Sequence, residues 1–351
     1  MACAVIALFL TPAPVRADSP PLPSGVQLPI PIRAAVRVLD IVNIQETRSL
    51  LTADVEIVQR WTDPTASFDR IARGAEHIDY VGAAAEHRLT TLWSPGLEIE
   101  NQIGPSHAES YSLSVFADGR ITLIRRLDAD FRVVYDMSSF PFDRQWLRLS
   151  LVTPRHSANE VLLTDTELDR QQSSIGNTVS AVNWRARGLV FRNETFFGWN
   201  ARPFSRLAVT AVVDRAWPRY ILRLFVPFFA VMSISLFILW APHDILQNNH
   251  RAQMTFSALL ALAALSFTFE TSFPGAISMN SPIASMISTG YFYLPFVLTI
   301  DLLLVQERPA LSRRFPYLLA EIRRNVRVTL PLLFLALCAI SLFAISGPGE
   351  R

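Results

Sequence analysis

The second half of the chain contains four long runs of apolar residues separated by short polar segments. The runs cover about residues 220–240, 252–269, 282–305 and 328–345. Each is close to the roughly 20 residues that a helix needs to cross the hydrocarbon core of a bilayer. Only helices and closed barrels satisfy their backbone polar groups in lipid, and runs of this length are typical of helices. The sequence therefore predicts four transmembrane helices within residues 218–346.

The first half of the chain has a different pattern, in which short segments alternate between apolar and polar positions. Turn residues such as Asp118-Gly119 separate these segments, as expected of strands joined by tight turns. The expected strands cover residues 51–61, 110–114, 121–124, 132–135, 146–152, 181–191 and 206–213. We therefore predict an all-β sandwich over residues 33–217, preceded by a proline-rich lead-in at 18–32.

The second apolar run carries its polar residues on one side. The residues of this stripe are Gln253, Ser257, Leu260, Ala264, Phe267, Glu270 and Thr271. A helix repeats every ~3.6 residues, so this spacing places them on one face. Polar groups in a membrane helix are costly unless they face protein or water. The stripe is therefore interpreted as the wall of a pore; the alternative is a packed helix whose glutamine and serine hydrogen-bond to neighbours.

The distribution of arginine predicts the orientation of the helices. The segment 306–327 is rich in arginine, and the short loop after the first run carries His250 and Arg251. The loop that follows Glu270 has no arginine. Positive charge marks the cytoplasmic side, so the sandwich and the C-terminus are expected outside. Residues 1–17 resemble a secretory signal that ends in small residues.

Composition argues against several other classes of function. Basic residues exceed acidic residues by two, 32 against 30, so no nucleic-acid partner is indicated. The two cysteines, Cys3 and Cys338, provide neither a disulfide framework nor a metal site, and the six histidines show no zinc spacing. The sequence contains no glycine-rich phosphate loop, nucleophile elbow or recognisable pair of catalytic carboxylates. We expect no metal, no cofactor and no enzymatic activity.

Four motifs follow one another along the chain. They are Trp61-Thr62-Asp63-Pro64, Trp93-Ser94-Pro95, Phe140-Pro141-Phe142-Asp143 and, in the first apolar run, Leu224-Phe225-Val226-Pro227. In this order, and before four spans with a short third-to-fourth loop, they resemble the motifs of the pentameric ligand-gated ion channels, the Cys-loop receptor family. The half-cystines that give this family its name would fall at Val133 and Leu147. The chain is thus similar to the bacterial branch, which lacks the disulfide.

The resemblance implies a homopentamer in the bacterial inner membrane, with the sandwich in the periplasm. The second helix of each subunit would line a central pore for ions, and a small-molecule ligand would bind between neighbouring sandwiches. We expect a closed gate at Leu260 and Phe267, and a cation preference set by Glu270, with His250 at the inner mouth. The alternatives are a proton-gated or anion-selective channel of the same fold, a non-conducting receptor, and a membrane enzyme or transporter.

The resemblance also implies a charged cluster where the sandwich meets the membrane. Glu46 and Arg215 stand where the family places an acidic and a basic residue, and Asp143 belongs to the third motif. This cluster would couple ligand binding to channel opening. Three separately solvated charges are the alternative. The other members of the expected coupling interface are Phe140, Pro141 and Phe142.

The family's ligand-binding segments map onto ten residues of this chain. They are Glu56, Val58, Glu98, Asn101, Arg155, His156, Phe191, Phe196, Phe197 and Trp199. Aromatic rings suit a cationic ligand through cation–π attraction. However, Arg155 and His156 stand in the segment where the family commonly offers an aromatic side chain, which leaves a zwitterion or a carboxylate open. Packing of these rings at a subunit interface is the alternative.

Overall fold

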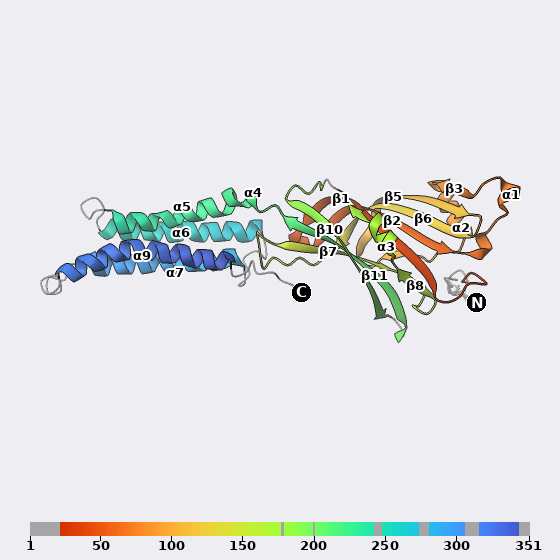
Figure 1. Cartoon of the computed structure of the whole chain (residues 1–351). Helices are drawn as coiled ribbons and strands as arrows, with labels where there is room; N and C mark the ends of the chain where they lie inside the picture. Colours follow the sequence, from red (N-terminus) through yellow and green to blue (C-terminus); the bar gives the residue numbers. More distant parts are fainter. Residues whose placement is uncertain are drawn as a thin grey trace, which may run out of the picture.

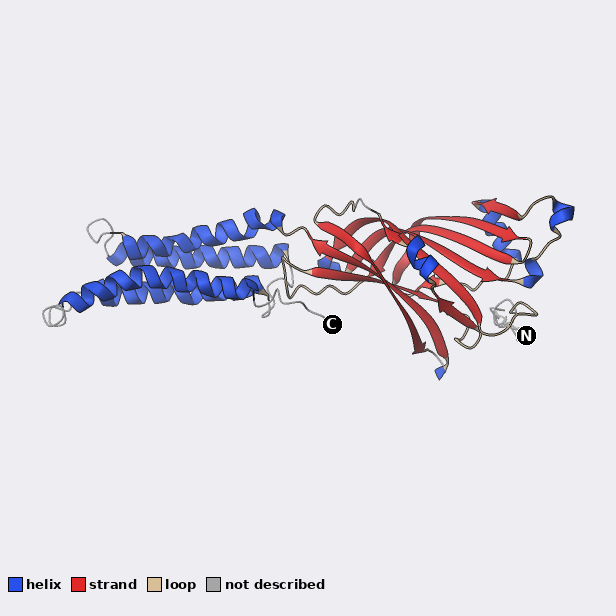
Figure 2. Cartoon of the chain, in the orientation of Figure 1, coloured by secondary structure: helices blue, strands red, loops and turns tan. Residues whose placement is uncertain are grey.

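A β-sandwich forms one end of the chain and a bundle of four helices forms the other (Figure 1, Figure 2). The computed structural model describes residues 22–176, 179–198, 201–241, 248–273, 281–305 and 316–343. This architecture confirms the expected all-β domain followed by four helices long and apolar enough to span a membrane. The expected signal at residues 1–17, and Trp199 of the expected ligand site, lie outside the described residues.

The described strands form two sheets. The larger sheet has the order β3-β5-β6-β2-β1-β8, with β9 beside β1, and the smaller has the order β10-β11-β7-β4. The larger sheet consists of β1 (Ile30–Gln45), β2 (Leu50–Thr62), β3 (His77–Val81), β5 (Gln102–Phe116), β6 (Arg120–Arg132), β8 (Val161–Thr164) and β9 (Ser174–Ile175). The smaller sheet consists of β4 (Glu98–Ile99), β7 (Arg144–Val152), β10 (Trp184–Phe197) and β11 (Pro203–Arg215). Only β8 and β9, which pair with β1, run parallel to their neighbour among these strands.

The alternating sequence pattern explains how the sheets pack. In β2, every second residue from Leu51 to Trp61 is buried, because successive side chains of a strand point to opposite faces. These residues meet apolar side chains of the smaller sheet, such as Leu149 and Val209, in one core. Trp61 and Trp93 lie in this core with their ring centroids 6.5 Å apart. The first two sequence motifs therefore meet inside the sandwich.

Several strand boundaries differ from those expected. Residues 121–124 and 132–135 were expected as separate strands, but β6 continues without a break to Arg132. Pairing of β6 with β2 along its whole length supplies the hydrogen bonds that hold the intervening polar residues in the sheet. The lead-in is also shorter than expected, because β1 begins at Ile30, where its pairing with β8 starts.

Short helical segments connect the strands. They are η1 (Glu46–Arg48), η2 (Pro64–Ala66), α1 (Arg70–Arg73), α2 (Ala83–Thr91) and α3 (Glu167–Gln172). Helix α3 begins with a capping box, in which Thr166 and Asp169 hydrogen-bond to each other's backbone N–H. Asp169 also binds Arg60 of β2 at 2.6 Å, which fixes α3 to the larger sheet.

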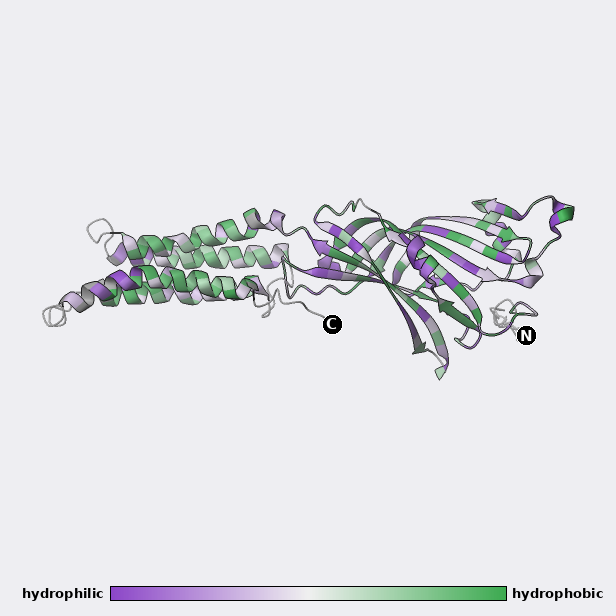
Figure 3. Ribbon diagram, viewed as in Figure 1, coloured by the Kyte–Doolittle hydropathy of each residue, from purple (hydrophilic) through white to green (hydrophobic). Residues whose placement is uncertain are grey.

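The membrane domain contains four long helical segments. They comprise α4 (Pro218–Tyr220), the π-helical turn η4 (Ile221–Phe225) and α5 (Val226–Trp240), then α6 (Asn248–Ser272), α7 (Pro282–Val305) and α9 (Pro316–Phe343). The irregular turn η4 ends two residues before Pro227, which lacks the backbone N–H that a regular helix uses. Part of the expected inner loop 306–327 is helical, since α9 begins at Pro316. Figure 3 shows the apolar bundle, with hydrophilic residues gathered at the end of α9 far from the sandwich.

Candidate functional site

Helix α6 has one face packed inside the bundle and one face that no described residue of the chain covers. Arg251, Thr255, Ala258, Leu262 and Phe269 are buried. The uncovered face carries the expected stripe of Gln253, Ser257, Leu260, Ala264, Phe267, Glu270 and Thr271, all exposed. Leu260 is 73% exposed and Phe267 is 68% exposed. Water, lipid or another copy of the chain must therefore contact this face.

Two polar residues of the stripe have no side-chain partner in the described part of the chain, whereas the hydroxyl of Thr271 donates to the carbonyl of Phe267 at 3.1 Å. Neither Gln253 nor Ser257 hydrogen-bonds to any described residue through its side chain. Other hydroxyls of α6 behave differently: Thr255 donates to the carbonyl of Arg251 at 2.9 Å, and Ser266 donates to that of Ala263 at 2.9 Å. The alternative of a packed helix required Gln253 and Ser257 to bind neighbouring helices, and the described structure contains no such contact.

Arg251 lies in the first turn of α6 but points away from the stripe. Its guanidinium donates to both carboxylate oxygens of Asp301 on α7, at 3.0 and 2.9 Å. It also donates to the carbonyls of Ile238 and Ala241 at the end of α5. The charge of Arg251 is thus compensated by Asp301 inside the bundle. His250, in contrast, is exposed at this mouth of α6.

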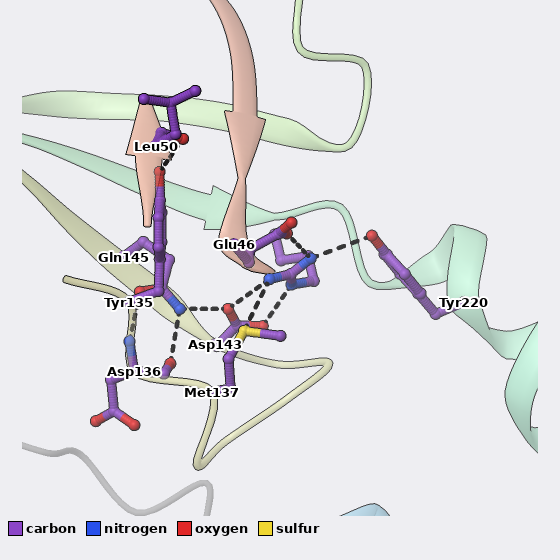
Figure 4. A network of polar contacts seen from close by, with 9 residues as sticks. Glu46, Leu50, Tyr135, Asp136, Met137, Asp143, Gln145 and Tyr220 are labelled. Carbon is purple, nitrogen blue, oxygen red and sulfur yellow. Dashed lines mark hydrogen bonds and ion pairs between the residues drawn. The ribbon is translucent and has the colours of Figure 1, made fainter. Parts of the chain in front are cut away.

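Arg215 binds both Asp143 and Glu46 where the sandwich joins the helices. Figure 4 shows Asp143, Glu46 and Tyr220 of this region. Arg215, at the end of β11, donates to the two carboxylate oxygens of Asp143 at 2.6 and 3.0 Å, and to Glu46 at 2.9 Å. The side chains of Arg215 and Asp143 are almost fully buried, with exposed fractions of 1% and 2%. Such bidentate, charge-assisted hydrogen bonds are among the stronger polar contacts in proteins. The three charges therefore form one cluster and are not separately solvated.

Further side chains complete the shell of the cluster. Gln145 donates to Asp143 at 2.6 Å and to the carbonyl of Asp136 at 2.7 Å, while Arg215 donates to the hydroxyl of Tyr220 at 3.2 Å. The guanidinium carbon also lies 4.2 Å from the ring centroid of Trp184. Sequence reasoning missed these residues, because their role depends on segments far apart in the chain. The polar Gln145, two positions after Asp143 and thus on the same strand face, was the available signal.

Burial opposes the charge of Arg215, but the hydrogen bonds and the negative charge of Asp143 outweigh it and raise the guanidinium's pKa above its ordinary value. Arg215 is therefore protonated at every physiological pH. Burial, together with the charge of Glu46, also raises the pKa of Tyr135, so its hydroxyl remains a donor to the carbonyl of Leu50 at 3.0 Å.

Three aromatic rings connect the sandwich directly to the pore-lining candidate. Phe140 lies 5.4 Å from Tyr220 and 5.1 Å from Phe273, and Tyr220 lies 5.6 Å from Phe273. Phe140 belongs to the loop before β7, Tyr220 begins the first span, and Phe273 follows the last residue of α6. Phe142 makes separate contacts in the same region, 5.5 Å from Trp217 and 6.5 Å from Phe225. Pro141 follows Phe140 through a cis peptide bond.

The expected ligand aromatics lie on the β10–β11 hairpin, which projects from the sandwich (Figure 1). The rings of Phe196 and Phe204 are stacked, with their centroids 5.7 Å apart. The guanidinium carbon of Arg206 lies 4.1 Å from the ring centroid of Phe196. Arg206 also binds Glu100 at 2.6 Å. The guanidinium of Arg206 thus already covers the ring of Phe196, a contact that the sequence analysis did not predict. Phe197 is 77% exposed and leaves its ring available.

Three other residues expected at the ligand site make contacts within the sandwich itself. Asn101 donates to the carbonyls of Arg132 and Arg148, both at 2.8 Å, and accepts from the backbone of Ser150. Its amide therefore ties the two sheets together. Val58 is buried, and Phe191 packs against the sandwich core.

His156, another residue expected at the ligand site, is buried. It is only 4% exposed, and its ring lies 5.7 Å from that of Trp93. Its Nε2 atom has no hydrogen-bond partner among the described residues. Burial lowers the pKa of His156, with Glu160 opposing this shift and Arg155 adding to it. A neutral imidazole, sheltered from solvent, is the stable form.

The remaining expected ligand residues are exposed or paired. Glu98 and Arg155 are exposed near the free end of the smaller sheet, and the aliphatic part of Arg155 lies over Gly96. Glu56 lies on the outer face of the larger sheet and pairs with Arg37 at 3.0 Å. The chain alone therefore does not bring Glu56 together with the hairpin.

Comparison with known proteins agrees with this architecture. A family model described as the neurotransmitter-gated ion-channel ligand binding domain matches residues 18–217. A proton-gated ion channel of Gloeobacter violaceus is 22% identical over 335 residues, which cover 94% of this chain and 87% of that protein. The neuronal acetylcholine receptor subunit alpha-10 of Rattus norvegicus is 25% identical over 247 residues, 70% of this chain and 53% of the subunit. Subunit alpha-9-I of Oncorhynchus mykiss is 23% identical over 241 residues, 68% of this chain and 40% of that subunit. The chain thus spans about half the length of these animal relatives.

We predict that Arg215→Gln disrupts the junction. Removing one partner of a buried charge pair costs about 3–5 kcal/mol, because the carboxylate left behind is unpaired. The variant should assemble less well or, where it assembles, transmit binding to the membrane domain less effectively. Size-exclusion chromatography and thermal unfolding in detergent measure the first effect.

Arg144→Gln is the matched control for this experiment. Arg144 pairs with Asp214 at 2.8 Å, but its side chain is 55% exposed, so its loss should cost only about 0–1 kcal/mol. Equal behaviour of the two variants would contradict the importance assigned to the buried cluster.

Proposed function

Because this chain belongs to the neurotransmitter-gated ion-channel family, we propose that it forms a homopentameric ligand-gated channel of the bacterial inner membrane. The family consists of channels, which confirms the expectation that the chain is not an enzyme. In the proposal, the sandwich and the C-terminus lie in the periplasm, and the arginine-rich segment 306–327 lies in the cytoplasm. Arg308, Arg313 and Arg314 belong to that segment, and positive residues are retained on the cytoplasmic side.

The uncovered face of α6 is the observation that carries the proposal. One helix cannot enclose a water path, but five copies related by a closed rotation can do so. Gln253 and Ser257 would then contact water inside the pore, which explains why their side chains have no partner among the described residues of one chain. The non-conducting receptor and the transporter remain weaker alternatives, since neither explains a polar stripe that faces away from the rest of its own bundle.

The gate is proposed at Leu260 and Phe267, with Ala264 between them. Rings of apolar side chains narrow a pore and allow it to dewet, which stops ions without a plug. Coupling from the sandwich to this gate is proposed to pass through the Arg215 cluster and the rings of Phe140 and Phe273. Phe273 directly follows α6, so displacement of its ring would act on the outer end of the pore helix.

Cation preference is proposed from the charges that face the pore. Glu270 would form a ring of carboxylates at the outer mouth, and such rings attract cations. At the inner mouth, Asp301 compensates Arg251 inside the bundle, so the permeation path would not meet this arginine as a free charge. His250 is exposed there, as is the uncharged Asn249.

The ligand site is proposed between neighbouring sandwiches, beneath the end of the β10–β11 hairpin. Glu98, Arg155 and Phe197 offer both signs of charge and an accessible ring on one subunit. Glu56 would contribute from the neighbouring subunit. Because Arg206 already covers Phe196, a small zwitterion or carboxylate fits this site at least as well as an amine.

Proton gating is a second candidate, favoured by the surroundings of His156. A buried imidazole whose Nε2 lacks a partner disfavours protonation. As pH falls below about 6.5, any state that exposes His156 takes up a proton more readily and gains population relative to the state that buries it. The opposing charges that act on the ring are those of Arg155 and Glu160.

We expect Leu260→Ser to raise the resting conductance or the sensitivity to agonist. A serine ring is wetted more easily than a leucine ring, since burying one leucine side chain is worth ~1.5–3 kcal/mol. Purified protein in a planar bilayer, recorded across a screen of ligands and pH, measures both quantities. Leu303→Ser on α7 is the control, because Leu303 is 64% exposed outside the stripe. Unchanged gating in the Leu260 variant would place the gate elsewhere.

Glu270→Gln should reduce the cation preference. The substitution removes five carboxylates from the proposed outer mouth while keeping their size. Reversal potentials in a salt gradient should therefore move toward the chloride potential. A parent channel that already reverses near the chloride potential would overturn cation selectivity, and it would leave the proposed pore intact.

If protons gate the channel, His156→Phe should shift its response to lower pH or remove it. Phenylalanine keeps the packing on Trp93 and cannot be protonated. His87→Phe on α2 removes an exposed histidine and should leave the response unchanged. A parental pH–current curve for His156→Phe would exclude this residue as the proton sensor.

A further inference from the structure

A cleft of about 450 Å³ opens on the outward face of the larger sheet, which is the face opposite the core. Residues of β1, β2 and β6 line its floor, and residues of α3 line one side. The cleft lies near the start of β1, whereas Glu46 at the membrane junction follows the end of this strand. Glu56 of the proposed ligand site precedes Arg60 of the cleft by four residues of β2, which is about 13 Å along the strand. The cleft is therefore separate from that site and from the proposed pore.

Strand pairing places two arginines side by side in this cleft. Arg33 of β1 and Arg60 of β2 are directly opposite each other, so their side chains lie on the same face of the sheet. Like charges directly opposite each other destabilise a sheet. The charge of Arg60 is compensated, since its guanidinium donates to Asp169 at 2.6 Å and to Gln172 at 2.5 Å, both on α3. Arg33 is exposed, and its side chain forms no hydrogen bond or ion pair with any described residue.

A third arginine, Arg120 at the start of β6, lines the same cleft. Its guanidinium carbon lies 5.0 Å from the ring centroid of Phe116. Arg120 pairs with Asp118 at 2.6 Å, but both side chains are more than half exposed, and such surface pairs are weak. The described lining contains three guanidinium groups and one carboxylate, that of Asp169. Positive charge therefore remains in excess even when Asp118 is counted.

The lining favours a phosphate group over a carboxylate. Guanidinium groups bind both in a planar, bidentate arrangement, but a phosphate monoester offers three acceptor oxygens and a carboxylate only two. Arg33, Arg120 and the hydroxyl of Thr122 are donors available to such a group in the cleft. The cleft is larger than a phosphate ion, and its volume lies within the range of about 300–1,000 Å³ that is typical of small-molecule sites. Phe116 and Leu168 supply apolar surface to the remaining space.

We propose that this cleft binds a small organic phosphate. The phosphate group contacts Arg33 and Arg120, and the organic part of the ligand lies against Phe116 and Leu168. Arg60 remains bound to α3 and adds positive charge without leaving its partners. The site requires neither ion conduction nor the ligand site beneath the β10–β11 hairpin, so it does not rest on the proposed function.

Phosphorus NMR of glycerol phosphate tests this site in the full-length protein. The protein is kept in a phosphate-free maltoside detergent at neutral pH, and the line width of the glycerol phosphate signal is followed as protein is added. We expect the line to broaden, and we expect inorganic phosphate to reverse the broadening. Glycerol, which carries no phosphate, should not reverse it. Binding should weaken at higher salt, because salt screens exposed charges.

Variants of two arginines distinguish the cleft from general surface charge. Arg33→Gln should weaken the apparent affinity for glycerol phosphate about tenfold, the equivalent of about 1.4 kcal/mol. Because Arg33 has no partner among the described residues, this variant should keep the parental melting temperature. Arg132, at the other end of β6, is also exposed and forms no ion pair with any described residue, so Arg132→Gln should bind like the parent. Arg33→Lys keeps the charge but not the bidentate geometry, and it should give an intermediate affinity.

Three outcomes would overturn the proposal. An absence of broadening means that the cleft binds no organic phosphate, for instance because a neighbouring subunit fills it. Parental affinity in the Arg33→Gln variant, or an equal loss in Arg132→Gln, means that the phosphate binds elsewhere or through general surface charge. Displacement by succinate that matches displacement by inorganic phosphate means that the cleft responds to negative charge alone. Each result is obtained without recording currents, so failure here is distinguishable from failure of the proposed channel.

Discussion

The attachment of the sandwich to the membrane domain depends on the burial of one charge, that of Arg215. A guanidinium removed from water is tolerated only when its donors are paired. Here the partners come from separate segments: Glu46 after β1, Asp143 before β7, and Tyr220 at the start of the first span. Each segment must therefore keep its position if the buried donors of Arg215 are to keep their hydrogen-bond acceptors. The aromatic rings around the cluster exclude water and strengthen these contacts.

A second buried arginine fixes the opposite end of the bundle. Arg251 joins α6 to Asp301 on α7 and to the last carbonyls of α5, whose partial negative charge favours a cation. At its outer end, α6 is followed by Phe273, which contacts Phe140. The helix is thus held at both ends by side chains of other elements, while no described residue of the chain covers its polar stripe. Relative movement of the two ends would be transmitted to that stripe.

Sequence periodicity predicted the features that depend on local spacing. The stripe of α6 was visible because Gln253 and Ser257 are polar within an apolar run, and the helical repeat alone places them on one face. The meeting of Glu46, Asp143 and Arg215 was expected only through resemblance to a family, since no local pattern connects them. The contacts that the sequence analysis missed are those that depend on strand pairing and on closure of the sandwich. Arg206 reaches Phe196 because β10 and β11 pair as a hairpin, and Asn101 reaches both sheets only once the sandwich is closed.

If a ligand binds beneath the hairpin as proposed, the position of Arg206 limits its chemistry. An amine would have to displace a guanidinium that already lies over Phe196 and is held by Glu100. That exchange replaces one cation–π contact by another and breaks an ion pair, so it provides little net driving force. A ligand that also carries a carboxylate gains a contact with Arg155, which is exposed nearby and forms no ion pair with any described residue. At the proposed site, the arrangement of charges therefore favours a ligand with a negative group over a simple amine, although both would approach the same accessible ring of Phe197.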